Sequence, residues 1–133
     1  MKSANSHAGA RPKNFQFSIL QFSIKNTTQK ILPRIKFEKI KDRVLGKKFK
    51  LSLVLCSDSL SHRLNRIYRH KDKPTNVLSF TLSKNSGEIF INLSKTKTFS
   101  ALELFIHGLL HLKGMRHGDT MEQAETKLLK KFR

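Results

Sequence analysis

The sequence contains no tryptophan and a single cysteine, and it has no long apolar run. Cys56 alone cannot form an internal disulfide, which argues against a disulfide-stapled secreted domain and favours a reducing, cytoplasmic compartment. Cys56 follows the apolar run 51–55, so we expect it to be a buried strand residue rather than a nucleophile. No segment approaches the roughly 20 apolar residues of a membrane-spanning helix, and no membrane role is expected.

Acidic residues are also scarce, with 9 Asp and Glu against 27 Lys and Arg, giving a net charge of +18. Residues 1–50 hold 13 basic and 2 acidic residues, and residues 51–133 hold 14 and 7, so the excess is not confined to a tail. Such a balance favours a polyanionic partner, with nucleic acid as the leading candidate. The alternative is a solvated basic surface without a specific partner.

The length of 133 residues suits one domain with a core of its own. We expect this domain to span residues 15–133. Residues 1–14 are basic and lack the apolar middle of a signal peptide. We interpret them as a disordered basic arm, with a short targeting piece or a non-native remnant as the alternatives.

Apolar periodicity predicts that strands and helices alternate along this domain. Strands are expected at 15–25, 49–56, 77–82 and 88–92, with a turn at 85–87 between the last two. Helices are expected from Pro33 to Gly46, after Ser57 or Asp58, after Ser100, and from Asp119 or Thr120 to about Phe132. The second helix should bury a stripe made of Leu60, Leu64, Ile67 and Tyr68. Ser100 and Glu103 have the spacing of a capping box.

Three histidines close together form the most informative pattern, with His107, His111 and His117 spaced as H-x3-H-x5-H. Residues four apart share one face of a helix, and Gly114 can end that helix and turn the chain so that His117 returns. Three neutral imidazoles with one open position are typical of a catalytic zinc site. The pattern resembles the H-E-x-x-H of metalloproteases, but Gly108 occupies the position of the glutamate base. Ordinary peptide hydrolysis is therefore disfavoured, and the general base stays unassigned.

Two separated motifs make the chain similar to the YbeY family of bacterial endoribonucleases that mature ribosomal RNA. The first is N65-R-I-Y-R69 followed by K71-D-K-P-T-N-V-L-S-F80, and the second is H107-G-L-L-H-L-K-G-M-R-H117. G87-E-I-F-I91 resembles a further family strand. The resemblance extends from about Leu51 to the C-terminal residue and is weaker before it.

The resemblance implies a small zincin-like α+β domain with a mixed sheet, packed helices and a metal-site helix near the C-terminus. It implies one Zn²⁺ per chain on His107, His111 and His117, with Arg69 and His107 as catalytic residues. It also implies cleavage of single-stranded RNA, chiefly at the 3′ end of small-subunit ribosomal RNA, and ribosome quality control. Ribosomal proteins and GTPase assembly factors are further candidate partners. Candidate RNA contacts are Arg66, Lys71, Lys73 and Arg116, and the strand-edge positions beside the cleft are Thr75, Asn76, Ser79 and Phe80.

Met115 and Arg116 depart from the family's Tyr-Asp before the third histidine, and Arg116 places a positive charge beside the expected cation. The segment between Asn92 and Ser100 is also short. Three functions therefore stay open: a zinc-dependent endoribonuclease, a non-catalytic RNA-binding assembly factor with a degraded or structural metal site, and another metallohydrolase. Glu103 is a candidate support for a ligand, although its capping-box role is favoured.

Overall fold

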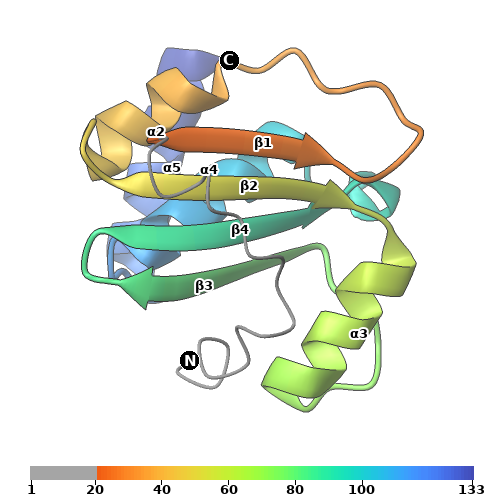
Figure 1. Cartoon of the computed structure of the whole chain (residues 1–133). Helices are drawn as coiled ribbons and strands as arrows, with labels where there is room; N and C mark the ends of the chain where they lie inside the picture. Colours follow the sequence, from red (N-terminus) through yellow and green to blue (C-terminus); the bar gives the residue numbers. More distant parts are fainter. Residues whose placement is uncertain (1–20) are drawn as a thin grey trace.

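A four-stranded mixed sheet organises the chain in the computed structural model, which describes residues 21–133 (Figure 1). Its spatial order is β1 (Phe22–Asn26), β2 (Lys50–Cys56), β4 (Ser86–Asn92) and β3 (Val77–Ser83). Neighbours β1, β2 and β4 run parallel, whereas β3 is antiparallel to β4 and lies at an edge. The predicted α+β class with a mixed sheet is confirmed.

Strand β2 is central because it pairs on both sides, with Leu53 opposite Ile24 of β1 and Ile89 of β4. Within β2 every residue except Lys50 and Val54 is buried, in keeping with its nearly continuous apolar sequence. Leu51, Leu53 and Leu55 alternate toward one face and are fully buried. Cys56 at the end of β2 is buried too, as predicted.

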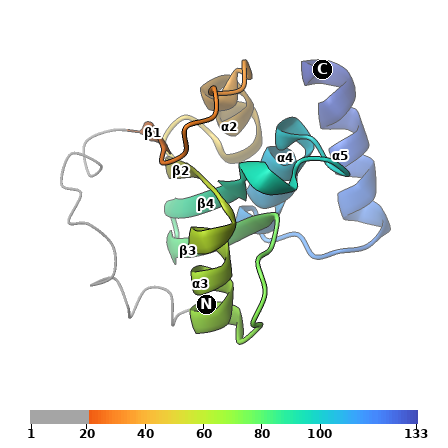
Figure 2. The same cartoon turned by 90° about the vertical axis from the view of Figure 1, so that its right-hand side faces the viewer.

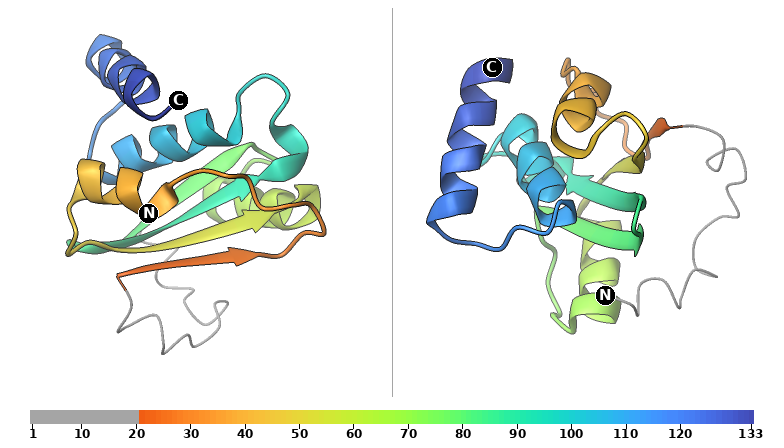
Figure 3. Two further views of the ribbon diagram at one scale, coloured as in Figure 1. Left: turned by 90° about the horizontal axis from the view of Figure 1, so that it is seen from above. Right: turned by 90° about the vertical axis from the view of Figure 1, so that its left-hand side faces the viewer.

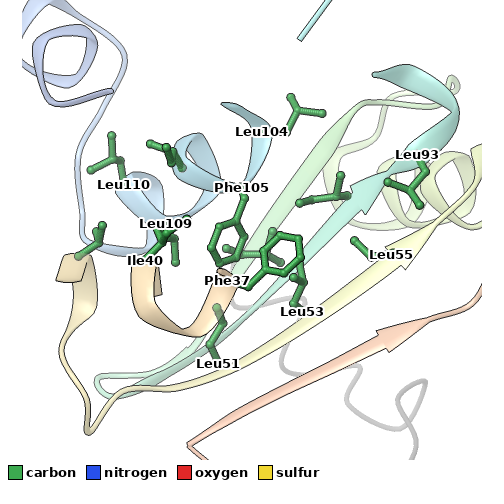
Figure 4. Packing of buried hydrophobic residues seen from close by; sticks show 14 of the residues in the cluster. Phe37, Ile40, Leu51, Leu53, Leu55, Leu93, Leu104, Phe105, Leu109 and Leu110 are labelled. Carbon is green, nitrogen blue, oxygen red and sulfur yellow. The ribbon is translucent and has the colours of Figure 1, made fainter. Parts of the chain in front are cut away.

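Helices α2 (Phe37–Leu45) and α4 (Ala101–Leu112) lie against one face of the sheet, and α5 (Asp119–Phe132) packs on α4 on the same side (Figure 3). The main core lies between them and the sheet, where the rings of Phe37 and Phe105 pack edge to face at 4.9 Å (Figure 4). Helix α4 is the middle layer of this core and contacts α2, α5, β3 and β4. No helix in residues 21–133 has the length and apolar character needed to cross a membrane.

Helix α3 (Asp58–Arg69) packs at the β3 side of the sheet, apart from the other helices (Figure 2). A second, smaller apolar cluster joins its Leu64 and Tyr68 to Leu78, Phe80 and Phe90 of the sheet. Phe90 points to the face opposite Ile89 and Ile91, because side chains alternate along a strand. The predicted buried stripe is wrong at Ile67, which is 44% exposed, since the sheet contacts α3 along a narrower strip.

Two buried polar residues of α3, Ser61 and Asn65, hold the loop that leads into β3. The Ser61 hydroxyl donates to the Thr75 carbonyl at 2.6 Å, and the Thr75 amide donates to Ser61 Oγ at 2.9 Å. The Asn65 side chain donates to the Lys73 carbonyl at 2.8 Å. These bonds satisfy loop backbone groups that would otherwise be buried without partners, and they fix where β3 begins.

Several predicted boundaries differ from the structure. Pro33 does not start the helix, because the Ile35 amide donates to the Pro33 carbonyl in a tight turn and α2 begins only at Phe37. The β3–β4 turn is at residues 84–85, and Gly87 belongs to β4. Between Asn92 and Ser100 the structure has one 3-10 turn, η3 (Leu93–Lys95). The predicted arm at 1–14 and the strand residues 15–20 lie outside the described residues.

Candidate metal centre

Three histidine side chains converge beside α4, as the sequence predicts. His107 and His111 lie one turn apart on α4, and His117 lies in the loop before α5. One ligand nitrogen from each ring can be chosen so that all lie within 4.8 Å of one another. The ring centroids are 4.6, 4.7 and 5.0 Å apart. The three side chains therefore form a compact triad of ligand nitrogens.

Local structure at the two ends of α4 determines where the histidines lie. At its start Ser100 and Glu103 form the predicted capping box: the Ser100 amide donates to Glu103 Oε1 at 2.9 Å, and the Glu103 amide donates to Ser100 Oγ at 3.1 Å. At its end Gly114 takes a φ of 102°, a conformation that glycine adopts readily. The chain reverses there, which brings His117 back toward His107 and His111.

The Nδ1 atoms of two histidines are each held by a partner. His107 Nδ1 lies 2.6 Å from Glu125 Oε2, and His111 Nδ1 lies 3.1 Å from the Met115 carbonyl oxygen. Both acceptors require the hydrogen on Nδ1, which leaves each Nε2 with a free lone pair. The two Nε2 atoms are 3.1 Å apart. Two nitrogens bound at about 2.1 Å to a tetrahedral ion would lie roughly 3.4 Å apart, so little movement is needed.

The electrostatic setting keeps His111 in the form that binds metal. Burial, followed by the neighbouring His107, lowers the pKa of His111 below its ordinary value of 6.5. The imidazole is therefore neutral at neutral pH, and a metal ion does not have to displace a proton from it.

Glu125 is the site residue that the sequence interpretation missed. It lies 18 residues after His107, on α5, and reaches the triad only because α5 packs against α4. One signal was available: Met121 is buried at 1% exposure, and Glu125 comes one helical turn later on the same face of α5. Glu103, the acidic residue considered from the sequence, is engaged in the capping box instead.

Gly108 explains why no glutamate base follows His107. A Cβ atom at this position would lie 3.1 and 3.2 Å from the Cδ1 and Cγ2 atoms of Ile89 in β4. The residue is buried between α4 and the sheet. A larger side chain there would point into the core rather than toward the triad, so a peptidase base has no place at this position.

The Met115-Arg116 departure affects the site less than its charge suggests. Met115 supports His111 through its backbone carbonyl, a contact that does not depend on the side-chain type. Its side chain packs against the main core. Arg116 is exposed.

A cleft of about 450 Å³ opens beside His107 and His117. It lies between the start of β3, the loop before α4, and the inner face of α5. Its other walls are formed by Asn76, Val77, Phe99, Glu103, Leu104, Ile106, Glu122, Glu125 and Leu129. Of the expected strand-edge residues, Asn76 lines this cleft, whereas Phe80 is buried in the α3 cluster.

Arg69 lies at the end of α3 and reaches the same edge strand. Its Nη2 donates to the Ser79 carbonyl at 3.0 Å, and its guanidinium lies 5.4 Å from the centre of the Phe80 ring. Burial lowers the pKa of Arg69 below its ordinary value, but the group stays cationic. Ser79 is two residues along β3 from Val77 of the cleft, a spacing of roughly 7 Å in a strand.

The other basic residues expected to contact RNA are exposed but do not line the cleft. Arg66 lies on α3, Lys71 and Lys73 on the loop after it, and Arg116 on the loop before α5. One of them is thus on a helix and three are on two loops, and none forms part of the cleft wall.

Comparison with known proteins gives one consistent result. The family model described as "Endoribonuclease YbeY" matches residues 12–133. An Endoribonuclease YbeY of Neorickettsia sennetsu is 35% identical over 65% of this chain and 76% of its own length, and one from a Wolbachia species is 31% identical over 90% and 80%. Other curated relatives are matched over about two thirds of their length (65 and 66%). The solution structure of TM1509 from Thermotoga maritima has the same fold, with a TM-score of 0.54, 22% identity, and coverage of 82% of this chain and 87% of that one.

Proposed function

Because the chain belongs to the YbeY family of endoribonucleases, we propose that it is a metal-dependent endoribonuclease with one ion held by His107, His111 and His117. The observation that carries the proposal is the triad itself, with ligand nitrogens within 4.8 Å of one another and two rings oriented through Nδ1. The functional unit is the domain from residue 15 to residue 133.

Zinc is the ion that the donor set fits best. Three neutral imidazoles with an open position are the ligands of catalytic zinc, and the Nε2 separation of 3.1 Å is close to the tetrahedral value. When bound, zinc would lower the pKa of a coordinated water and polarise a phosphoryl oxygen. Hydrolysis by water and attack by the RNA 2′-hydroxyl are both compatible with this site.

The chain's own residues prepare the site. Glu125 fixes the tautomer of His107, and the Met115 carbonyl fixes that of His111, so neither ring has to reorient when the ion binds. Glu125 also places a negative charge behind His107, where it would support a cation bound at Nε2. His107 thus both lines the cleft and accepts the support of this carboxylate.

Arg69 is proposed to stabilise charge on the scissile phosphate. Its guanidinium is hydrogen-bonded to Ser79 of β3, two residues along the strand from Val77, which lines the cleft. A planar fork of donors can hold two phosphate oxygens and act on the charge that develops in the transition state. To reach a phosphate, Arg69 exchanges its bond to the Ser79 carbonyl for one to the substrate.

Single-stranded RNA is the proposed substrate, within ribosomal RNA maturation at the 3′ end of the small-subunit RNA and ribosome quality control in the cytoplasm. The charge of +18 supplies sequence-independent attraction to a polyanion. Arg66, Lys71, Lys73 and Arg116 are proposed backbone contacts, and ribosomal proteins and GTPase assembly factors are proposed partners. A flexible strand can bring one phosphate to a recessed ion, which a stiff A-form duplex does not allow.

Cleavage of a single-stranded RNA with and without a chelator tests the proposal. The reconstituted protein should cleave, chelator should stop cleavage, and added zinc should restore it. His107→Ala should not cleave but should bind RNA nearly as well as the parent, because surface cations supply most of the affinity. Equal cleavage by His107→Ala and the parent would refute the proposal.

A non-catalytic RNA-binding factor is the second candidate, favoured by Arg116, which places a cation next to the third ligand. It predicts RNA binding without cleavage even when reconstitution has filled the site. A peptidase is disfavoured, because Gly108 is packed against Ile89 where the base would have to be.

A further inference from the structure

Phe99 is an aromatic side chain left exposed at the wall of the cleft. It is 48% exposed, although the hydrophobic effect disfavours leaving a ring of this size in water. Ile31, Leu32 and Ile67 are the other large apolar side chains exposed within residues 21–133, and Phe99 is the aromatic one among them. It also lines the same cleft as His107 and His117.

The position of Phe99 is fixed by its neighbour in sequence. Ser100 directly follows it and is held on both its amide and its hydroxyl by the capping box with Glu103. A ring attached to an anchored backbone loses little conformational freedom when a flat ligand stacks on it. Rigid aromatic platforms of this kind bind nucleobases in single-stranded RNA.

The charge of the cleft wall indicates which part of a nucleotide enters it. None of its described lining residues is a lysine or arginine, whereas Glu103, Glu122 and Glu125 are acidic. Glu125 is engaged with His107, and Glu103 with the Ser100 amide. Away from the histidines, the acidic part of this wall would repel a phosphate. A neutral base would not be, and it can stack on Phe99 while its phosphate stays near the histidines.

We propose that the cleft is a nucleobase subsite, in which Phe99 stacks on a base next to the scissile phosphate and Glu122 accepts a hydrogen bond from the exocyclic amino group of that base. The cleft volume of about 450 Å³ is within the range of ligand sites and large enough for one nucleoside. The subsite rests on the proposed function, since it assigns the substrate's position in the same cleft.

Glu122 gives the subsite a preference among bases. Its side chain is exposed in the cleft and makes no hydrogen bond with any other described residue, so both carboxylate oxygens are available. A carboxylate accepts from the amino groups of cytosine, adenine or guanine. Uracil carries a carbonyl oxygen in place of the amino group and is disfavoured. The subsite therefore binds an amino-bearing base more tightly than uracil.

Binding of a fluorescent strand tests the stacking directly. The probe is an oligouridine with one 2-aminopurine, whose fluorescence falls when the base stacks, measured in chelator so that no cleavage intervenes. The parent should quench the probe. Phe99→Ala should lose the quenching and bind roughly 5-fold or more weakly, in line with the loss of one stacked base. Phe99→Tyr should retain both.

Ile31→Ala is the matched control, because it removes a 90% exposed apolar side chain from outside the cleft. It should behave as the parent. Equal quenching by Phe99→Ala and the parent overturns the stacking. Circular dichroism of Phe99→Ala, together with retention of binding by Phe99→Tyr, separates loss of the ring from loss of the fold.

The base preference is tested with two oligouridines, one carrying a single adenine and one with none. The parent should bind the adenine strand more tightly than the strand without adenine. Glu122→Ala should reduce that difference in affinity, while still quenching the 2-aminopurine probe as the parent does. Equal affinity of the parent for both strands overturns the role of Glu122.

The tests of the subsite need no cleavage, so they can fail independently of the proposed nuclease activity. Phe99-dependent quenching by a protein that cuts no RNA would refute the nuclease activity but leave the subsite supported. Normal RNA cleavage together with binding that does not depend on Phe99 would refute the subsite and leave the nuclease activity supported.

Discussion

Glu125 Oε2 and His107 Nδ1 lie 2.6 Å apart and join helix α5 to helix α4 at the metal triad. The two side chains are about equally exposed, at 25 and 26%. The contact orients the ring rather than pairing two full charges, because a histidine that binds a metal ion must be neutral. Its value lies in fixing which nitrogen of His107 faces the ion.

Glu125→Gln should weaken zinc binding by about 10- to 100-fold, the usual cost of removing the group that orients a histidine ligand. The amide keeps the size of the side chain but loses the charge. Competition with a chromophoric chelator measures the affinity. Glu38→Gln on α2 removes the same charge outside the cleft and should leave the affinity unchanged. If both variants bind zinc like the parent, Glu125 does not support the ligand.

Arg69→Ala should lower the cleavage rate by about 100-fold, as expected for a donor that stabilises transition-state charge. RNA affinity should fall much less, because the guanidinium acts mainly when charge develops at the phosphate. Single-turnover rates and equilibrium binding of the same strand separate the two. Arg63→Ala, an exposed arginine of the same helix, is the control. A loss of rate and affinity by the same factor would show that Arg69 only binds.

RNA affinity should decrease steeply with salt. Four or five phosphate contacts, with a slope of about −0.7 per phosphate for single strands, give a slope of log K against log salt near −3. A titration at several salt concentrations measures the slope. The annealed duplex of the same sequence should be cut poorly. Binding that is insensitive to salt, or preferential cleavage of the duplex, would contradict a mainly electrostatic single-strand site.

Gly108→Ala should destabilise the protein even though alanine favours helices by about 1 kcal/mol over glycine. The added methyl would overlap Ile89, which is fully buried and cannot move aside easily. Overpacking of this kind costs about 1–3 kcal/mol, so a net loss of roughly 1 kcal/mol is expected in urea unfolding. The same change in an Ile89→Ala background should cost less or be favourable. Additive effects would show that the contact is not the cause.

Cys56 should be unreactive in the folded protein. Burial, followed by the charge of Asp58, raises its pKa from 9.0 to about 12. The thiolate is disfavoured in the folded state, so the associated stability is present below pH 9 and declines as the pH rises toward about 12. A thiol reagent at pH 8 should label Cys56 only after denaturant is added. Rapid labelling of the native protein would contradict its buried position.

Local sequence patterns predicted most of the elements because local physics determines them. The capping box at Ser100, the turn at Gly114 and the apolar strand ending at Cys56 each depend on a few adjacent residues. The triad was predictable for the same reason, since His107 and His111 share a helix face and His117 follows one turn of chain. The resemblance supplied the role of Arg69, which no periodicity indicates.

Features that depend on distant packing were missed. Glu125 joins the site through the contact between α5 and α4, and nothing in the spacing of its own helix names His107 as its partner. Pro33 is suited to the first turn of a helix, yet the chain turns there and the helix starts at Phe37. Ile67 fits the apolar period of α3, but it is 44% exposed and does not belong to the apolar cluster that joins α3 to the sheet.

The bond from Arg69 to the Ser79 carbonyl has a consequence for self-association. In the described sheet β3 is an edge strand, and edges with free carbonyls invite pairing with another chain. The guanidinium occupies one such carbonyl in the free protein. If Arg69 turns to a phosphate, as proposed, and releases the Ser79 carbonyl, it would uncover this part of the edge. Binding of RNA and edge-to-edge pairing of two molecules would then be linked through a single side chain.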